Sequence, residues 1–237
     1  MPQSVDRALD LLDAVAEAPG PVTAKALARR LDCGLSTVYA LLGALTDRGH
    51  LARTPAGYTL GYRLPSLHRA FQRQLRIDER VHEVLLRLRR ASGADVFFST
   101  YRDGEIAVVD GVTAPAGSAF SVGRDPDAHA TAHGKALLAA LPGAARRQYL
   151  AATGMAPRTT RTLTSPELLE RELRQVRRTG IAVEQEEAAF GMACVAVPVR
   201  TADGALTAVS AALPVADFAR LRAPLTEALR RETAALR

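Results

Sequence analysis

The chain has 237 residues, of which 48% are hydrophobic and 24% are charged, and its formal net charge is +6. This composition is that of a globular protein and excludes an intrinsically disordered chain. No apolar stretch approaches the roughly 20 residues needed to span a membrane, so we expect no membrane partner. Aspartates interrupt the first apolar stretch, which excludes a signal peptide, and two cysteines, Cys33 and Cys194, are too few for a disulfide framework. We therefore expect a cytoplasmic protein.

The positive charge is concentrated in one part of the chain. Between residues 18 and 75 there are eight Lys and Arg residues, opposed only by Asp32 and Asp47, so this window carries the net charge of the whole protein. A basic segment beside a neutral remainder is typical of a nucleic-acid-binding domain. A solvated, Arg-rich surface is the alternative, and charge alone leaves both interpretations open.

Residues 1–62 show the pattern of three short helices followed by a hairpin. Ser4, Thr23 and Ser36 are each placed to cap the start of a helix, and Gly49 is placed to end the third helix in a left-handed turn. The segment PAG then separates two short β-rich runs. Three helices, the last two joined by a tight turn, with a hairpin after them predict a winged helix-turn-helix domain.

The third helix has one apolar face and one face of mostly small residues with little charge. Small residues let a recognition helix bring its backbone close to the floor of the DNA major groove. Hydroxyls at its start can reach phosphates or bases, and basic residues outside it can hold the phosphate backbone. A three-helix packing unit without DNA contacts is the alternative. The residues expected to contact DNA are Lys25, Ser36, Thr37, Tyr39, Ala40 and Arg53.

We expect a linker helix over residues 63–76 and a second domain over residues 77–237. In the second domain strands and helices come in separate runs, which predicts an α+β fold with an antiparallel sheet covered by helices. The expected elements include a strand within residues 117–124, a helix capped by Ser165 that ends at Gly180, and a terminal helix that starts at Pro224.

Three polar patterns in the second domain suggest chemistry, and each has a plainer structural interpretation. His129 and His133 have the spacing of two metal ligands on a helix, but no third ligand is evident. Cys194 with His133 would give a nucleophile and a base, although a single cysteine in an apolar strand is more often inert packing. The acidic run at residues 184–187 is typical of a charged loop edge. We expect no metal, no cofactor and no catalytic residue.

Six stretches resemble the IclR family of bacterial transcription regulators, and together they cover essentially the whole chain. They are SVDRALDLLDAV, LSTVYALLGALTDRGHL, YTLGYRL, HATAHGKALLAALP, GIAVEQEEAAFGMACVAVPVR and GALTAVSAAL. The resemblance implies a winged helix-turn-helix domain, a linker helix that helps to pair two such domains, and a GAF-like effector-binding domain. It also implies a homodimer or a dimer of dimers, with double-stranded operator DNA and a small-molecule effector as partners. Family members often carry Arg at the position of Ala40.

The resemblance further implies an effector site in the second domain. Glu184 stands where the family usually has Asp or Ser, Ala212 stands where a serine is often found, and His133 stands where members often have a small or aliphatic residue. These departures disfavour small oxo-acids and favour a ligand with hydroxyl or amine donors. Glu184 would repel an anion unless it is protonated or paired with a protonated His133. The expected site residues, with Met192 in an apolar wall, are Ala132, His133, Glu184, Met192, Cys194 and Ser210.

The sequence thus predicts a DNA-binding transcription regulator, a repressor, whose operator binding is controlled by a small molecule. We expect the effector to shift the relative placement of two DNA-binding domains in a dimer. Two alternatives stay open. One is a DNA-binding dimer without a ligand, and the other is an enzyme that uses Cys194.

Overall fold

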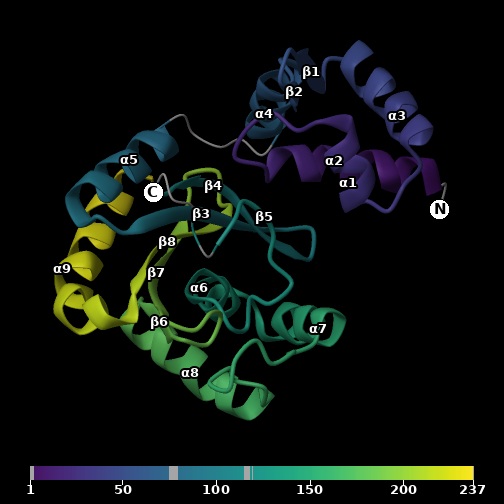
Figure 1. The fold of residues 1–237 in the computed structure, drawn as a ribbon. Coiled ribbons are helices and arrows are strands. Elements are labelled where there is room, and N and C mark those ends of the chain that lie inside the picture. Colours follow the sequence, from purple (N-terminus) through teal and green to yellow (C-terminus); the bar gives the residue numbers. More distant parts are fainter. Residues whose placement is uncertain (1–2, 75–79, 115–117, 119, 237) are drawn as a thin grey trace. The chain divides into compact units, whose positions relative to one another are not determined.

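A computed structural model describes residues 3–74, 80–114, 118 and 120–236 of the chain. The chain divides into two compact units, Met1–Ile77 and Asp78–Arg237, each of which is described by itself (Figure 1). None of the described helices is both long enough and apolar enough to cross a membrane.

The first unit consists of three helices, a hairpin and a fourth helix. Its core is made by the apolar faces of the three helices, closed by Leu51 and Tyr58 of the hairpin. The hairpin is tied to the helices because Val22 and Tyr58 exchange two backbone hydrogen bonds. The winged helix-turn-helix prediction is confirmed. The elements are α1 (Gln3–Ala16), α2 (Ala24–Arg30), α3 (Leu35–Asp47), β1 (Leu51–Thr54), β2 (Gly57–Leu60) and α4 (Arg63–Gln74).

The ends of these helices agree with the sequence at two places and differ at two others. The Thr23 side chain accepts a hydrogen bond from the Ala26 backbone N–H at 3.2 Å and caps α2, and Gly49 adopts a left-handed φ of 74° after α3. The caps predicted at Ser4 and Ser36 are wrong. Ser4 lies inside α1, and α3 begins after Gly34, because glycine is itself tolerated at the N-cap. Ser36 therefore points its side chain to solvent.

The second unit is a six-stranded antiparallel sheet between two groups of helices, which confirms the α+β prediction (Figure 1). The strand order is β5-β4-β3-β8-β7-β6. Helix α6 packs on one face with α8 beside it, and α5 and α9 pack on the other. The elements are α5 (Arg80–Ser92), β3 (Asp95–Arg102), β4 (Glu105–Val112), β5 (Gly123–Arg124), α6 (Ala132–Ala140), α7 (Gly143–Thr153), α8 (Pro166–Thr179), β6 (Ala182–Gln185), β7 (Met192–Arg200), β8 (Leu206–Pro214), α9 (Val215–Thr233) and a short 3₁₀ helix, Ala234–Leu236.

Two expected elements of this unit differ from the structure. Of the strand expected within residues 117–124, the described part contains only the two residues of β5, while residues 117 and 119 lie outside the described residues. The terminal helix begins at Val215, so that Pro224 lies inside it. A proline in a helix removes one backbone hydrogen bond. The helix tolerates this loss because Phe218 and Leu225 bury their side chains, one on each side of that proline.

Helix α6 is buried on all sides, since eight of its nine residues are buried. Such a helix can fit only where its neighbours leave room for it. At Gly134 the room is so small that a Cβ atom would overlap the backbone of Ala128. Glycine therefore fixes how closely the loop before α6 approaches the helix.

We expect Gly134→Ala to destabilise the protein by about 1–3 kcal/mol, the usual cost of overpacking a well-packed interior. Gly43→Ala is the matched control, because Gly43 is also helical but has open space around its missing Cβ. The control should stabilise by about 0.5–1 kcal/mol through its helix propensity. Urea denaturation followed by circular dichroism measures both, and effects of the same sign would contradict the packing described for α6.

Candidate functional site

The outer face of α3 carries the residues that the sequence assigned to DNA contact. Ser36, Tyr39 and Ala40 are exposed, and Thr37 is half-buried, while Val38 and Leu42 face the core. The helix has no side-chain cap at its N-terminus, so its N-cap residue, Gly34, offers no side-chain acceptor to the backbone N–H groups of the first turn.

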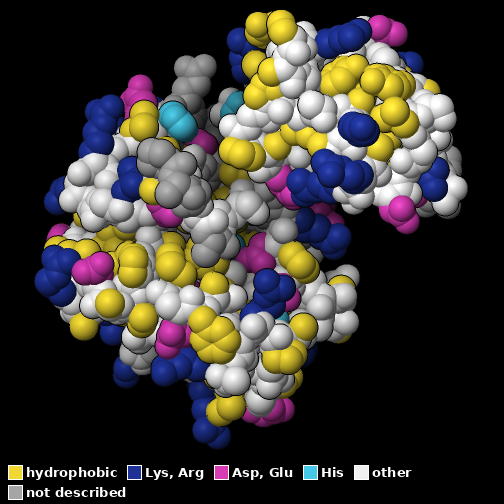
Figure 2. Space-filling model, in the orientation of Figure 1, with side chains coloured by type: hydrophobic (Ala, Val, Ile, Leu, Met, Phe, Trp, Pro, Cys, Tyr) yellow, Lys and Arg dark blue, Asp and Glu magenta, His cyan; other side chains and the backbone are white. Residues whose placement is uncertain are grey.

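Two of the basic residues predicted to contact DNA lie on other elements of this unit. Lys25 lies in the first turn of α2 and Arg53 lies in β1, and both are exposed. Neither forms an ion pair with another described residue, whereas Arg30 of α2 is paired with Glu17. Figure 2 shows basic and hydrophobic side chains together on the visible surface of this unit. The first unit thus presents a helix face of mostly small residues and, on two other elements, exposed cations that form no ion pair within the described part of the chain.

The second unit brings five of the predicted effector-site residues together at one face of its sheet. In the antiparallel register Glu184 pairs with Cys194, and Ala196, two residues after Cys194, pairs with Ser210. Paired residues point to the same face of a sheet, as do residues two apart on a strand. Ala132 of α6 belongs to the buried cluster on this face, and Met192 packs against that cluster.

Glu184 is almost completely buried, and only one of its carboxylate oxygens has partners. Its Oε2 accepts hydrogen bonds from the backbone N–H groups of Glu187 at 3.0 Å and Ala188 at 3.4 Å, and its carboxylate also accepts from the Cys194 thiol. Its Oε1 is buried without a hydrogen-bond partner among the described residues. Burial raises the pKa of Glu184, because the charged form loses its water. The site therefore holds an oriented acceptor that lacks a donor.

A second buried oxygen on this face also lacks a partner. The Ser99 side chain of β3 is buried, its hydroxyl has no hydrogen-bond partner among the described residues, and Ser99 pairs with Ala208 on the face that holds Ser210. Ser99 is not among the site residues predicted from the sequence. The available signal was its position two residues after Phe97, which places a polar group on the core-facing side of that strand.

His133 is buried beside this face but its partner is not Glu184. Its Nε2 lies 2.7 Å from Oδ2 of Asp125, which also accepts a hydrogen bond from the Thr131 hydroxyl. Burial alone would raise the pKa of Asp125, but the hydrogen bond and the charge of His133 outweigh it and lower that pKa. His129 instead lies 3.0 Å from the carbonyl oxygen of Ala156, so the two histidines serve separate contacts.

Cys194 does not have the surroundings of a nucleophile. Its thiol donates to Glu184 rather than contacting His133, and burial raises its pKa well above the ordinary value of a thiol. A protonated thiol beside a carboxylate is a poor nucleophile, because the thiolate is the reactive form. The geometry therefore does not support the hypothesis of an enzyme that uses Cys194.

Lys135 holds the turn that follows β6, the strand that contains Glu184. The lysine is completely buried in α6, and its Nζ donates to Glu187 at 2.5 Å and to Glu172 of α8 at 2.8 Å. Burial raises the pKa of Glu187, although the charge of Lys135 opposes that shift. The interpretation of the acidic run as a charged loop edge is wrong for Glu184 and Glu187, which are buried.

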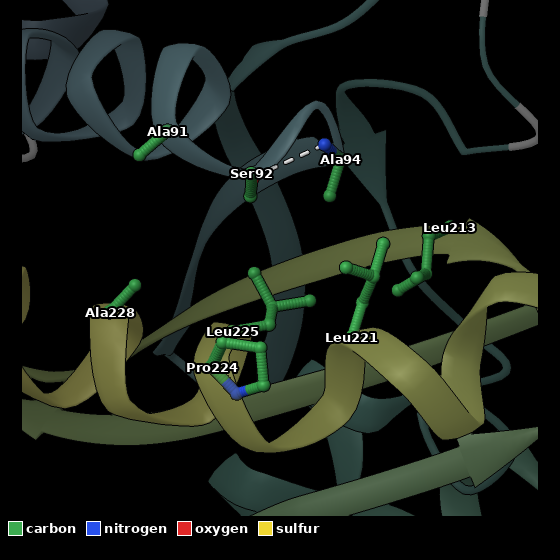
Figure 3. A pocket seen from close by; sticks show the side chains of 8 residues that line it. All are labelled: Ala91, Ser92, Ala94, Leu213, Leu221, Pro224, Leu225 and Ala228. Atoms are coloured by element: carbon green, nitrogen blue, oxygen red, sulfur yellow. Dashed lines mark hydrogen bonds between the residues drawn. The ribbon is translucent and has the colours of Figure 1, made fainter.

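A separate apolar hollow of about 90 Å³ lies on the opposite face of the sheet, between α5, β8 and α9 (Figure 3). Its lining is apolar except for Ser92, whose hydroxyl donates to the carbonyl oxygen of Leu88. This hollow contains no charged side chain, so we do not assign it to a polar effector.

Comparison with known protein families decides the identity of both units. Residues 4–55 match the IclR helix-turn-helix domain, and residues 70–236 match the bacterial transcriptional regulator IclR C-terminal domain. The chain belongs to the IclR family. It is thus a DNA-binding transcription regulator rather than an enzyme, and the family predicted from the sequence is confirmed.

The chain is similar to individual members of this family over most of its own length and most of theirs. The chain is 32% identical to the HTH-type transcriptional regulator Rv1719 of Mycobacterium tuberculosis, over 96% of this chain and 88% of that protein. It is 29% identical to the transcriptional repressor IclR of Escherichia coli, over 82% of this chain and 73% of that protein. The crystal structure of Thermotoga maritima IclR is similar with a TM-score of 0.76, 26% identity and coverage of 98% and 96%.

The buried, unpaired carboxylate oxygen makes Glu184 a source of instability. Because its pKa is raised in the folded state, the stability of the protein should fall as the pH rises from the ordinary value of 4.5 through the raised value. We expect Glu184→Gln to stabilise the protein at neutral pH by about 1–3 kcal/mol, the cost of a buried unsatisfied acceptor. The gain should shrink toward acid pH.

Urea denaturation at several pH values measures this difference, with Glu227→Gln on the exposed side of α9 as the control. The control should change stability by less than about 0.5 kcal/mol at every pH. A Glu184→Gln variant that is less stable than the native protein at neutral pH would show that the carboxylate is satisfied.

Proposed function

We propose that the protein is a cytoplasmic repressor in which residues 1–62 of the first unit hold operator DNA, and in which the second unit causes its release when a small molecule binds under α6. The observation that carries the proposal is the buried Oε1 of Glu184, which has no hydrogen-bond partner among the described residues. Such an acceptor is costly unless a ligand supplies a donor. The name of the Escherichia coli relative, a transcriptional repressor, supports repression as the direction of control.

In this proposal α3 lies in the major groove and the hairpin lies over the adjacent backbone. Ser36 and Thr37 stand at the start of α3, where uncapped amides and hydroxyls suit a phosphate. Tyr39 and Ala40 face the bases, while Lys25 and Arg53 hold phosphates on either side. Their positions on three different elements of one packed unit support this assignment.

We further infer that two copies of the chain act together as a homodimer. Val5 and Leu9 of α1, and Leu67 and Phe71 of α4, are exposed apolar side chains at helical spacing. Helix α4 buries none of its residues within the unit, although its sequence is amphipathic. An apolar stripe without a partner favours pairing with a second copy, and a two-fold dimer fits a palindromic operator.

The effector site proposed here comprises Ala132, Glu184, Met192, Cys194 and Ser210, with His133 behind them and Ser99 added by the structure. Its unpaired groups are an acidic acceptor and a hydroxyl, so a ligand that donates hydrogen bonds fits better than an anion. Because His133 is bonded to Asp125, it does not neutralise Glu184. Hydroxyl-rich or amine-bearing metabolites are therefore the favoured class.

We expect Tyr39→Ala to weaken specific DNA binding by about 1–3 kcal/mol, because its side chain contacts the groove. Lys25→Ala should weaken binding to every sequence and lower the salt dependence by about one counterion. Fluorescence anisotropy over a range of salt concentrations measures both, with Arg178→Ala on α8 as the control. Arg178 is exposed and basic but lies in the second unit.

If Tyr39→Ala leaves both the affinity and the sequence preference unchanged, the proposed placement of α3 in the major groove is wrong. If the affinity for duplex DNA does not fall as the salt concentration rises, the proposed phosphate contacts are wrong as well.

We expect the effector site to discriminate between ligand classes. Calorimetry should show that a polyol or amine binds the native protein more tightly than glyoxylate does, because a buried carboxylate repels an anion. Glu184→Ala should abolish the effect of the bound ligand on DNA release and leave DNA affinity unchanged, since the two sites lie in different units. If Glu184→Ala binds the ligand as tightly as the native protein does, the proposed location of the site is wrong. If the native protein binds glyoxylate tightly, the proposed ligand class is wrong.

A further inference from the structure

The face of α3 that is exposed to solvent lacks every side chain that reads bases through paired hydrogen bonds. Arg and Lys read guanine in this way, and Asn and Gln read adenine. None of these residues occurs among the 13 residues of α3, whose sequence is LSTVYALLGALTD. Its single charged residue is Asp47, at the last position of the helix. Direct readout by α3 must therefore use other groups.

What the exposed face does offer is mostly apolar. Leu35 is 43% exposed and Tyr39 is 53% exposed, and their separation of four residues places them along one edge of the face. Ala40 is exposed on the other side, with Gly43 between the two edges and open space beside its missing Cβ. Leu35 also lies outside the buried cluster of the unit, so packing does not explain it.

The apolar group that the major groove presents at its floor is the C5 methyl of thymine. Contact between that methyl and an exposed side chain removes apolar area of both from water. Lys25 and Arg53 are exposed on the same unit and form no ion pair with another described residue, which makes this unit complementary to a DNA duplex rather than to an apolar protein partner. Apolar side chains within a basic surface thus fit thymine-containing DNA.

We propose that Leu35, Tyr39 and Ala40 determine operator specificity by contacting thymine methyl groups. This inference rests on the proposed placement of α3 in the major groove. The hydroxyls of Ser36 and Tyr39 add hydrogen bonds to bases that lie next to the contacted thymines. The preferred half-site accordingly contains thymines at the positions facing the start of α3.

Uracil tests the proposal without altering the protein, because it keeps the hydrogen-bonding groups of thymine and lacks only the methyl. A high-affinity duplex is selected from a random library with the full-length protein and is then synthesised with uracil at one thymine at a time. Affinity should fall about fourfold at each thymine whose methyl is contacted, the equivalent of burying one methyl group.

Leu35→Ala should lose this sensitivity at one thymine in each half-site and keep it elsewhere. Leu168→Ala is the matched control, because Leu168 is 47% exposed on α8 in the second unit. Ala40→Arg should shift the selected sequence toward guanine, since arginine restores a bidentate reader. Neither variant at α3 touches the core, and circular dichroism melting verifies that each is folded.

If every uracil duplex binds as tightly as the thymine duplex while Tyr39→Ala still weakens binding, the methyl contacts are overturned and the placement of α3 in the groove stands. If neither uracil substitution nor Tyr39→Ala changes the affinity for DNA, both this inference and the proposed DNA interface are overturned. A selected half-site without thymine would also overturn the methyl contacts.

Discussion

The completely buried ammonium group of Lys135 is the constraint on which the second unit depends. A buried cation is tolerable only when paired, and removing one partner of such a pair typically costs about 3–5 kcal/mol. Lys135 is paired with Glu187, in the turn after β6, and with Glu172 of α8, so one side chain joins three segments. The position of α6 against the sheet is fixed by these pairs as much as by packing.

This arrangement gives the candidate site its electrostatic character. The turn that Lys135 holds also supplies the two N–H groups bound by Glu184, so the carboxylate is oriented before any ligand arrives. Preorganisation of this kind lowers the entropic cost of binding. The same turn leaves one oxygen of Glu184 and one of Glu187 buried without partners among the described residues. Functional sites often contain groups that lower the stability of the fold, because binding needs polar groups that a well-packed interior does not.

Local patterns in the sequence were sufficient for most of the fold. The cap at Thr23, the cap at Ser165 and the left-handed end at Gly180 each depend on neighbouring residues, and each occurs in the structure. Strand alternation and family resemblance placed Cys194 and Ser210 on one face. The pairs Asp125–His133 and Lys135–Glu187 could not be predicted, because their partners meet only after the chain has folded. The placement of Ser99 beside this face depends likewise on its pairing with β8.

Coupling between the two units can be measured by a thermal-shift screen of small metabolites, run on free protein and repeated on protein bound to its operator. The ligand site proposed in the second unit must be coupled to DNA binding in the first unit. Coupling is reciprocal, so a ligand that releases DNA must itself bind the DNA complex more weakly. We expect a hydroxyl-rich or amine-bearing ligand to raise the melting midpoint of the free protein more than that of the complex. Equal shifts for both forms would contradict it.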